Sequence, residues 1–146
     1  MDKTVIMKKT RTTQCKGKEA EHLFFSMLLK KGFDVYTPLV DDNRIDALVR
    51  LGANKYVEIQ IKSREADVKS PRGLADIKYT KGKSNYWFAI HTKHNNEPIW
   101  WLLSAKDFEK HATGGENDVW GITLNKDNPA HKRFILDEKR WEIFSQ

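Results

Sequence analysis

The chain has 146 residues, enough for one domain with its own core, and 32% of them are charged. Its apolar runs are far shorter than a membrane-spanning helix, it begins without the features of a signal peptide, and its single cysteine, Cys15, excludes an internal disulfide and a cysteine-based zinc site. We therefore expect a soluble, cytoplasmic protein with no membrane partner, and the net charge of +6 makes a polyanion the first partner to consider.

The first predicted elements are a basic arm and an amphipathic helix. Residues 1–15 contain few apolar side chains and are predicted to be a flexible arm in front of a single domain at residues 16–146. From Lys16 to Lys31, apolar residues recur at the spacing of one helical face, and Gly32 follows in the usual helix-ending position. Glu21 falls inside the apolar face, where a carboxylate is costly unless it is paired, hydrogen-bonded or near a metal. A role in a site and a salt bridge to a lysine at the rim of the core are both open for Glu21.

Alternating apolar and polar residues predict an antiparallel meander after this helix. Strands are expected at residues 33–39 and 44–51, with a turn at 41–43 between them. A hairpin connection at 52–55 then leads into a strand at 56–63. The order of elements is thus a helix followed by three strands.

The strand at 56–63 indicates a site, because its polar residues form a row. Glu58, Gln60 and Lys62 face one side of this strand, and its apolar residues face the other. A strand that packs one face on a core carries such a row where water or a partner meets it. Asp46 is on the preceding strand and Glu21 is on the helix, so neighbouring elements supply acids, an amide and a cation.

A strongly basic segment follows this strand. Residues 64–84 are polar and contain proline and glycine, so they are predicted to form a long surface loop with at most a short helix. Residues 1–18 and 62–83 together hold 13 of the 26 Lys and Arg residues but only four of the 20 acids. Clustered positive charge beside the polar strand favours nucleic acid as a partner, although a solvated, mobile pair of segments is the alternative. The cations expected to contact DNA are Lys16, Lys18, Arg64, Lys69, Arg72, Lys78, Lys81 and Lys83.

The second half of the chain is predicted to complete the sheet. Residues 85–91 are mostly apolar and indicate a buried central strand, with residues 99–103 as its hairpin partner. Ser104 is expected to cap a helix at 105–110. The remaining expected elements are a loop at Gly114 and Gly115, strands at 119–124 and 133–136, and a closing helix at 137–144.

The polar residues of the meander have the chemistry of a magnesium site. Phosphodiester hydrolysis needs a metal that neutralises charge on the phosphate oxygens and a water that is positioned and activated. Mg²⁺ prefers oxygen ligands, and it usually takes one or two carboxylates and keeps several waters. Asp46, Gln60 and the backbone carbonyl of Ile61 can supply these oxygens, and Mn²⁺ is an expected substitute for Mg²⁺.

Three further residues extend this candidate site. Lys62 lies two residues from Gln60 on the same face, so its ammonium can reach the same pocket. Glu21 is expected to act through a metal-bound water. Glu58, about 7 Å along the strand from Gln60, is an additional candidate ligand.

The order of these residues resembles the PD-(D/E)XK nuclease superfamily, which includes restriction endonucleases, Holliday junction resolvases and some homing endonucleases. The resemblance covers roughly residues 16–64, and its matching segments are Gly17–Glu21, Leu28–Val35, Arg44–Asp46 and Glu58–Ser63. It implies an α/β fold with a restriction endonuclease-like core: an N-terminal helix, a β-meander and a mixed central sheet flanked by helices. It also implies metal-dependent cleavage of DNA.

The resemblance assigns roles to individual residues and shows two departures. Asp46 takes the place of the family's first acid, Lys62 that of its lysine, and Glu21 that of its helix glutamate. Ile45 stands where the family often has proline. Gln60 stands where Asp or Glu is usual, which removes one negative charge from the metal site. Some superfamily members resemble this chain in having Gln-x-Lys and remain nucleases.

Three functions follow as hypotheses. The first is a Mg²⁺-dependent DNA endonuclease, with branched or otherwise structured DNA among its candidate substrates and no small-molecule cofactor. It is expected to act as a homodimer, by analogy, because two DNA strands need two active sites. The alternatives are a non-catalytic DNA-binding or assembly module of the same fold, weakened through Gln60, and a basic interaction protein that binds another nuclease or RNA. If Gln60 is a ligand, Gln60→Glu is expected to keep or raise metal affinity.

Overall fold

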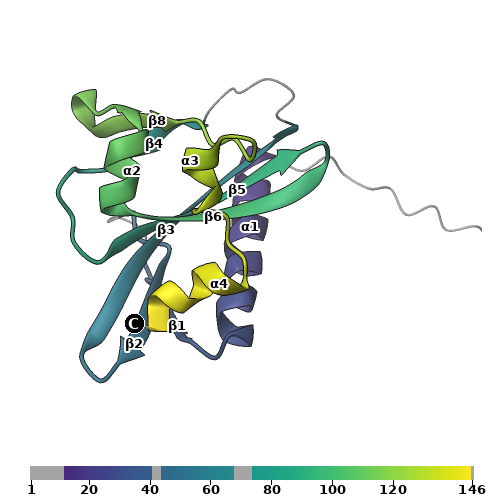
Figure 1. Ribbon diagram of the computed structural model, residues 1–146. Helices are drawn as coiled ribbons and strands as arrows, with labels where there is room; N and C mark the ends of the chain where they lie inside the picture. Colours follow the sequence, from purple (N-terminus) through teal and green to yellow (C-terminus); the bar gives the residue numbers. More distant parts are fainter. Residues whose placement is uncertain (1–11, 41–43, 68–73, 146) are drawn as a thin grey trace, which may run out of the picture.

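The computed structural model describes residues 12–40, 44–67 and 74–145. Its elements, in chain order, are α1 (Thr13–Lys30), β1 (Asp34–Tyr36), β2 (Ala47–Gly52), β3 (Lys55–Asp67), β4 (Leu74–Lys78), β5 (Tyr86–His94), β6 (Glu97–Ser104), α2 (Ala105–His111), β7 (Thr113–Gly114), η1 (Glu116–Asp118), β8 (Val119–Ile122), α3 (Pro129–Lys132), α4 (Glu138–Trp141) and η2 (Glu142–Ser145) (Figure 1). The predicted turn at 41–43 and most of the predicted arm at 1–15 lie outside the described residues. Within the described ranges, no helix is long and apolar enough to cross a membrane.

The central sheet is mixed, with the strand order β1-β2-β3-β5-β6. β1, β2 and β3 form the antiparallel meander that the sequence predicts. β5 pairs in parallel with β3 and antiparallel with β6, so it is an inner strand with β6 as its hairpin partner. The predicted α/β class, with an N-terminal helix before a mixed sheet, is therefore confirmed.

Helix α1 begins three residues before the predicted start. The Thr12 side chain accepts a hydrogen bond from the Cys15 N–H at 3.2 Å, which caps the first turn and sets the start at Thr13. At the other end, Gly32 has a φ of +85°, a left-handed conformation that glycine adopts without steric cost. Residues 13–15 of the predicted arm thus belong to the helix.

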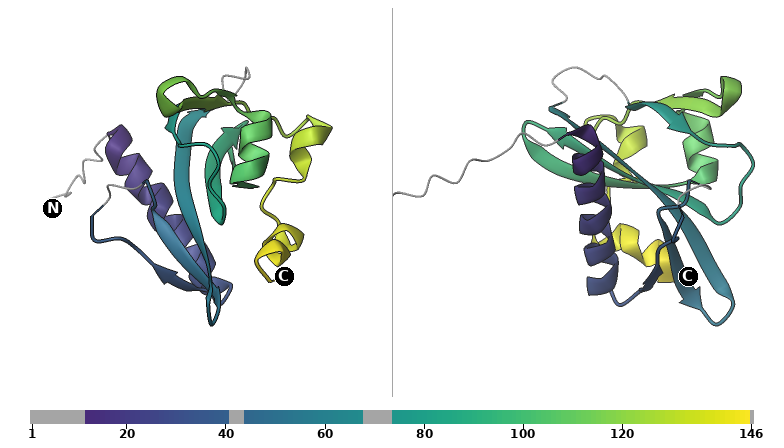
Figure 2. Two further views of the ribbon diagram at one scale, coloured as in Figure 1. Left: turned by 90° about the vertical axis from the view of Figure 1, so that its left-hand side faces the viewer. Right: turned by 180° about the vertical axis from the view of Figure 1, so that it is seen from behind.

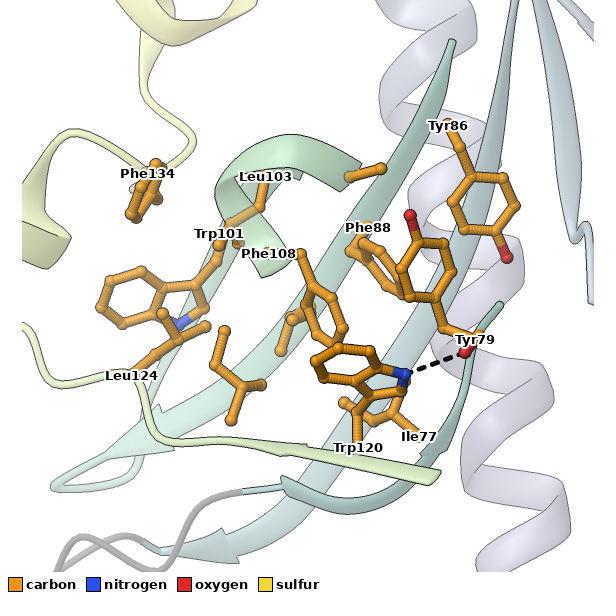
Figure 3. Close-up of a cluster of buried hydrophobic side chains, with 13 residues drawn as sticks. Ile77, Tyr79, Tyr86, Phe88, Trp101, Leu103, Phe108, Trp120, Leu124 and Phe134 are labelled. Carbon is orange, nitrogen blue, oxygen red and sulfur yellow. Dashed lines mark hydrogen bonds between the residues drawn. The ribbon is translucent and has the colours of Figure 1, made fainter. Parts of the chain in front are cut away.

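The central sheet is covered on both faces, and the two faces carry separate cores. In Figure 2, α1 and α2 lie on opposite sides of the sheet. The core on the α1 side includes Phe24, Leu28, Val57, Ile59, Ile61, Ala89, Leu102, Trp141 and Phe144. The core on the α2 side includes Ile77, Tyr79, Tyr86, Phe88, Ile90, Trp101, Phe108, Trp120 and Phe134 (Figure 3). The polar row of β3, which is Glu58, Gln60 and Lys62, therefore lies on a face of the sheet that other elements cover. Its residues contact the protein interior, and part of the row also borders a cavity.

The segment predicted as a loop at 64–84 contains strand structure. β3 continues to Asp67, and β4 pairs with β8 in a second, three-stranded sheet of order β4-β8-β7. Ile77 and Tyr79 are each 1% exposed, and the Trp120 Nε1–H donates a 2.8 Å hydrogen bond to the Tyr79 carbonyl (Figure 3). The loop prediction was wrong because β4 depends on a partner strand about 40 residues later in the chain, which local composition does not reveal.

Further differences lie at the strand ends and near the C-terminus. β1 is shorter than the predicted strand at 33–39, and β2 begins at Ala47 rather than at Arg44. Gly114 belongs to β7, although a loop was predicted there. The predicted strand at 133–136 reduces to a single bridge between Trp101 and Ile135, because α3 ends directly before it and Asp137 caps α4 directly after it. The predicted closing helix at 137–144 is formed by α4 and η2.

Candidate active site

The candidate site lies where β2 begins beside the middle of β3. The pairing of β2 with β3 starts at Ala47 opposite Ile59, and the Asp46 N–H donates to the Ile59 carbonyl at 2.9 Å. Ile61, two residues further along β3, is beyond this pairing. Its N–H donates instead to Asp46 Oδ2 at 2.7 Å. This hydrogen bond therefore holds the Asp46 carboxylate against the backbone of β3 at Ile61.

A cavity of about 350 Å³ opens at this point, between the middle of α1, the β2–β3 edge and β4. The residues that line it are Glu21, Arg44, Asp46, Gln60, Ile61, Lys62, Asp76 and Lys78. All four residues predicted to be catalytic thus surround one cavity, although they come from three elements. Arg44 and Asp76 also line it, and neither was predicted to belong to the site.

Glu21 reaches the cavity from α1. Its Oε2 lies 3.1 Å from the ammonium of Lys18, and its side chain is 19% exposed. Because it both pairs with a lysine and lines the cavity, both roles considered for Glu21 are compatible with its position. Lys18, predicted to contact DNA, is one turn before it on the helix.

Gln60 is the most buried member of the site, with only 3% of its surface exposed. The hydroxyl oxygen of Tyr86 lies 2.7 Å from Gln60 Oε1 and 2.6 Å from the Arg44 carbonyl oxygen. Burial, together with the nearby carboxylates of Asp46 and Glu58, raises the pKa of Tyr86 well above its ordinary value, so the phenol stays protonated. The sequence did not indicate Tyr86 as a site residue, because the apolar run that contains it predicts only a buried strand.

Two other predicted ligands differ in their placement. The N–H and C=O of one strand residue point to the same side. The Ile61 carbonyl therefore faces the same edge of β3 as its N–H, where the Asp46 carboxylate lies. Glu58 is half-buried opposite Tyr86 in the β3–β5 pairing and does not line the cavity. The backbone carbonyl is thus better placed for a cation than Glu58.

Lys62 connects this cavity to a second, basic one. The second cavity, about 460 Å³, shares Glu21, Ile61 and Lys62 with the first. Its other lining residues are Thr13, Lys16, Gly17, Ser63 and Arg64. Lys62 is half-buried, so its charge is less screened by water than that of an exposed lysine. The two cavities form a groove between the start of α1 and the second half of β3.

The predicted DNA-contacting cations are not all at this groove. Lys16 and Arg64 line the second cavity, and Lys78 lines the first. Lys83 lies with its ammonium 4.7 Å from the centre of the Tyr86 ring, and Lys81 is exposed in the connection between β4 and β5. Lys69 and Arg72 lie outside the described residues.

Two non-glycine residues beside the cavity have left-handed backbone conformations. Arg44 has a φ of +57° and Asp76 a φ of +60°. Asp76 lies in a β-bulge, because the β4–β8 register shifts by one residue between Leu74 and Ile77. Such conformations are uncommon outside glycine and concentrate at functional sites. Asp76, at the bulge, and Lys78, two residues later, both line the cavity.

The donor set of the cavity suits magnesium better than a cation that needs several carboxylates. Across the described ranges, no three His, Cys, Asp or Glu side chains are grouped closely enough to hold a metal by themselves. Asp46 offers a carboxylate and Ile61 a carbonyl oxygen, and Gln60 brings an amide whose oxygen lies 2.7 Å from the Tyr86 hydroxyl. Because Mg²⁺ keeps several waters and takes few carboxylates, these residues fit it.

This architecture is shared with a solved structure. No protein-family model matches the chain, and no curated protein matches it. Among solved structures, it is similar to the bacterial homing endonuclease I-Ssp6803I, with a TM-score of 0.66 and 16% sequence identity. The similarity covers 93% of this chain and 95% of that chain. At this identity, the likeness shows a shared fold over nearly the whole chain.

Proposed function

We propose that this protein is a divalent-metal-dependent DNA endonuclease with a site of the PD-(D/E)XK type. The observation that carries the proposal is the convergence of Glu21, Asp46, Gln60 and Lys62 on one cavity. The order of these residues along the chain led to the expectation of a nuclease. The cavity that they share is a separate observation, because it depends on the folded structure. The similarity to a protein named as a homing endonuclease supports DNA as the substrate.

The residues of the site divide the chemistry among them. Asp46, Gln60 and the Ile61 carbonyl would hold Mg²⁺, which supplies positive charge to the phosphate oxygens and lowers the pKa of water. The Lys62 ammonium, at the junction of the two cavities, attracts the scissile phosphate and can donate a hydrogen bond to the attacking water. Glu21 also lines the cavity, where it can accept a hydrogen bond from water.

The groove also offers a path for the DNA backbone. Lys16 and Arg64 line the second cavity and Lys78 lines the first, so each cavity has cations beside the proposed catalytic residues. Such contacts position a nucleic acid without reading its sequence. We further propose that two copies act together, because each chain offers one such site and duplex DNA has two strands. Structured DNA remains a candidate substrate.

One observation favours a second function, a DNA-binding module without catalysis. The side chain of Gln60 is buried and within hydrogen-bonding distance of Tyr86, so an internal partner competes with a metal for its amide. If the Gln60 oxygen faces Tyr86 permanently, the cavity has lost one metal ligand. The orientation of this amide therefore separates the two candidate functions.

Cleavage assays on linear, branched and single-stranded DNA, with Mg²⁺, Mn²⁺ or EDTA, test the proposal. We expect metal-dependent cutting that Lys62→Ala lowers by at least about 100-fold, because a charge at the developing transition state is lost. DNA binding should change little. Lys106→Ala is the matched control, since Lys106 is exposed on α2 and lines neither cavity. Binding without cutting on every substrate would favour the binding module, and no binding even at low salt would exclude both functions.

A further inference from the structure

The hydroxyl of Tyr86 has more acceptors around it than it has protons. Its oxygen lies 2.6 Å from the Arg44 carbonyl oxygen and 2.7 Å from Gln60 Oε1. A phenol has a single O–H proton, and a backbone carbonyl can only accept. If the proton goes to Gln60, the Arg44 carbonyl is left against a second oxygen at close range without a hydrogen bond. Two oxygens at 2.6 Å with no proton between them repel each other, so another arrangement is favoured.

A half-turn of the Gln60 amide removes this conflict. The oxygen and nitrogen of a glutamine amide exchange places by rotation about the last side-chain bond, and the surrounding donors and acceptors decide which faces which way. We propose that Tyr86 is a positioning residue: it donates to the Arg44 carbonyl and accepts from the Gln60 amide nitrogen, which turns the Gln60 oxygen toward the cavity. The value of that oxygen as a metal ligand rests on the proposed function, whereas the hydrogen-bond arrangement does not.

The surroundings keep Tyr86 suited to this role. Its ring stacks on Tyr79 with a centroid distance of 5.5 Å and meets the edge of Phe88 at 5.3 Å (Figure 3). The Lys83 ammonium covers the ring at 4.7 Å from its centre. Tyr86 is also only 2% exposed. These contacts hold the ring and so fix the position of its hydroxyl.

This arrangement also gives a physical reason for glutamine at position 60. An ionised glutamate has only acceptor oxygens, so a carboxylate at this position would compete with the Arg44 carbonyl for the one Tyr86 proton. Glutamine avoids this competition, because its N–H donates to Tyr86 and leaves the Tyr86 proton for the Arg44 carbonyl. Its oxygen is then still offered to the cavity. The departure from the family's usual acid is therefore matched to Tyr86 and need not weaken the site.

The energetic coupling between positions 60 and 86 tests the proposal. Urea unfolding in EDTA is measured for the wild type, Tyr86→Phe, Gln60→Met and the double variant, because methionine keeps the length of the glutamine side chain and removes its amide. In the wild-type background, Tyr86→Phe removes two hydrogen bonds, and in the Gln60→Met background it removes only the bond to the Arg44 carbonyl. We expect Tyr86→Phe to lower the folding constant about fivefold more in the wild-type background than in the Gln60→Met background. Tyr79→Phe, in the same cluster, should show equal losses in both backgrounds.

Equal losses in the two backgrounds, or a smaller loss in the wild type, would overturn the proposal. If Tyr86 donates to Gln60, it makes one hydrogen bond in the wild type and one, to the Arg44 carbonyl, in the Gln60→Met variant. Tyr86→Phe would then cost the two backgrounds about equally. Since this measurement needs neither metal nor cleavage, it can succeed even if the protein proves not to be a nuclease.

A second measurement serves if Gln60→Met does not fold. The chain has three glutamines, Gln14, Gln60 and Gln146, so glutamine labelled with ¹⁵N gives three side-chain amide pairs in an NMR spectrum. The proposal predicts a strong nuclear Overhauser effect between the Gln60 amide protons and the Tyr86 ring protons next to the hydroxyl. Absence of that effect in the folded wild type would refute it. Titration of Mg²⁺ into Tyr86→Phe should also show metal affinity reduced about fivefold, from loss of the orienting bond.

Discussion

Asp46 has a structural hydrogen bond and a proposed role as a metal ligand, and paired substitutions can distinguish the two. Its Oδ2 accepts the Ile61 N–H at 2.7 Å, which completes the edge of β3, and its carboxylate lines the candidate cavity. Asp46→Asn keeps an oxygen for Ile61 but removes the negative charge. Asp46→Ala removes both the charge and the acceptor. A purely structural residue and a metal ligand therefore respond differently to the two substitutions.

The magnitudes follow from the hydrogen bond. Leaving a partly buried N–H without its acceptor costs about 1–3 kcal/mol. An unfolding entropy of about 2.1 cal/mol/K per residue gives about 0.3 kcal/mol/K for this chain, so Asp46→Ala should lower Tm by about 3–10 °C. Asp46→Asn should lose at most about 1 kcal/mol, or about 3 °C, because a neutral acceptor remains. Both variants should cut DNA at least about 100-fold more slowly, because the carboxylate is lost from both.

Thermal unfolding in EDTA and plasmid cleavage in Mg²⁺ give the two readings independently. If Asp46→Asn cuts at the wild-type rate, the charge of Asp46 is not required and the proposed metal site is wrong. If Asp46→Ala unfolds at the wild-type temperature, the bond to the Ile61 N–H does not stabilise the edge of β3. Each result refutes a different part of the reasoning.

Three further predictions concern the core, the bulge and the groove. Phe108→Ala removes a fully buried ring and should destabilise the protein by about 3–5 kcal/mol in urea unfolding; a loss under about 1 kcal/mol would contradict this core. Asp76→Gly relieves the strain of a φ of +60°, so we expect Tm to rise. It also removes a carboxylate from the cavity, so we expect the rate of DNA cleavage to change, and an unchanged rate would show that Asp76 takes no part in the reaction. Replacing both Lys16 and Arg64 by alanine should reduce the salt dependence of DNA binding by about 1.8 in the slope of log K against log salt, whereas Lys106→Ala should leave it unchanged.

The amino-acid sequence by itself determined the features that arise from local periodicity. The 3.6-residue spacing of apolar residues predicted α1, and the two-residue alternation predicted the meander. Because β2 and β3 are joined by a short hairpin, the sequence also indicated that Asp46 lies near Gln60 and Lys62. The amphipathic register of α1 selected Glu21 over its neighbours, and Glu21 does line the same cavity.

Only the tertiary structure decided the features that depend on distant pairing. Asp76 reached the cavity because β4 pairs with β8, far along the chain, and forms a bulge there. Tyr86 came beside Gln60 because β5 pairs in parallel with β3 across a long crossover. Such contacts leave no local pattern, since the polar group of one tyrosine in an apolar run gives no sign of its partner. The physical reason for glutamine at position 60 therefore became visible only when the strands were brought together.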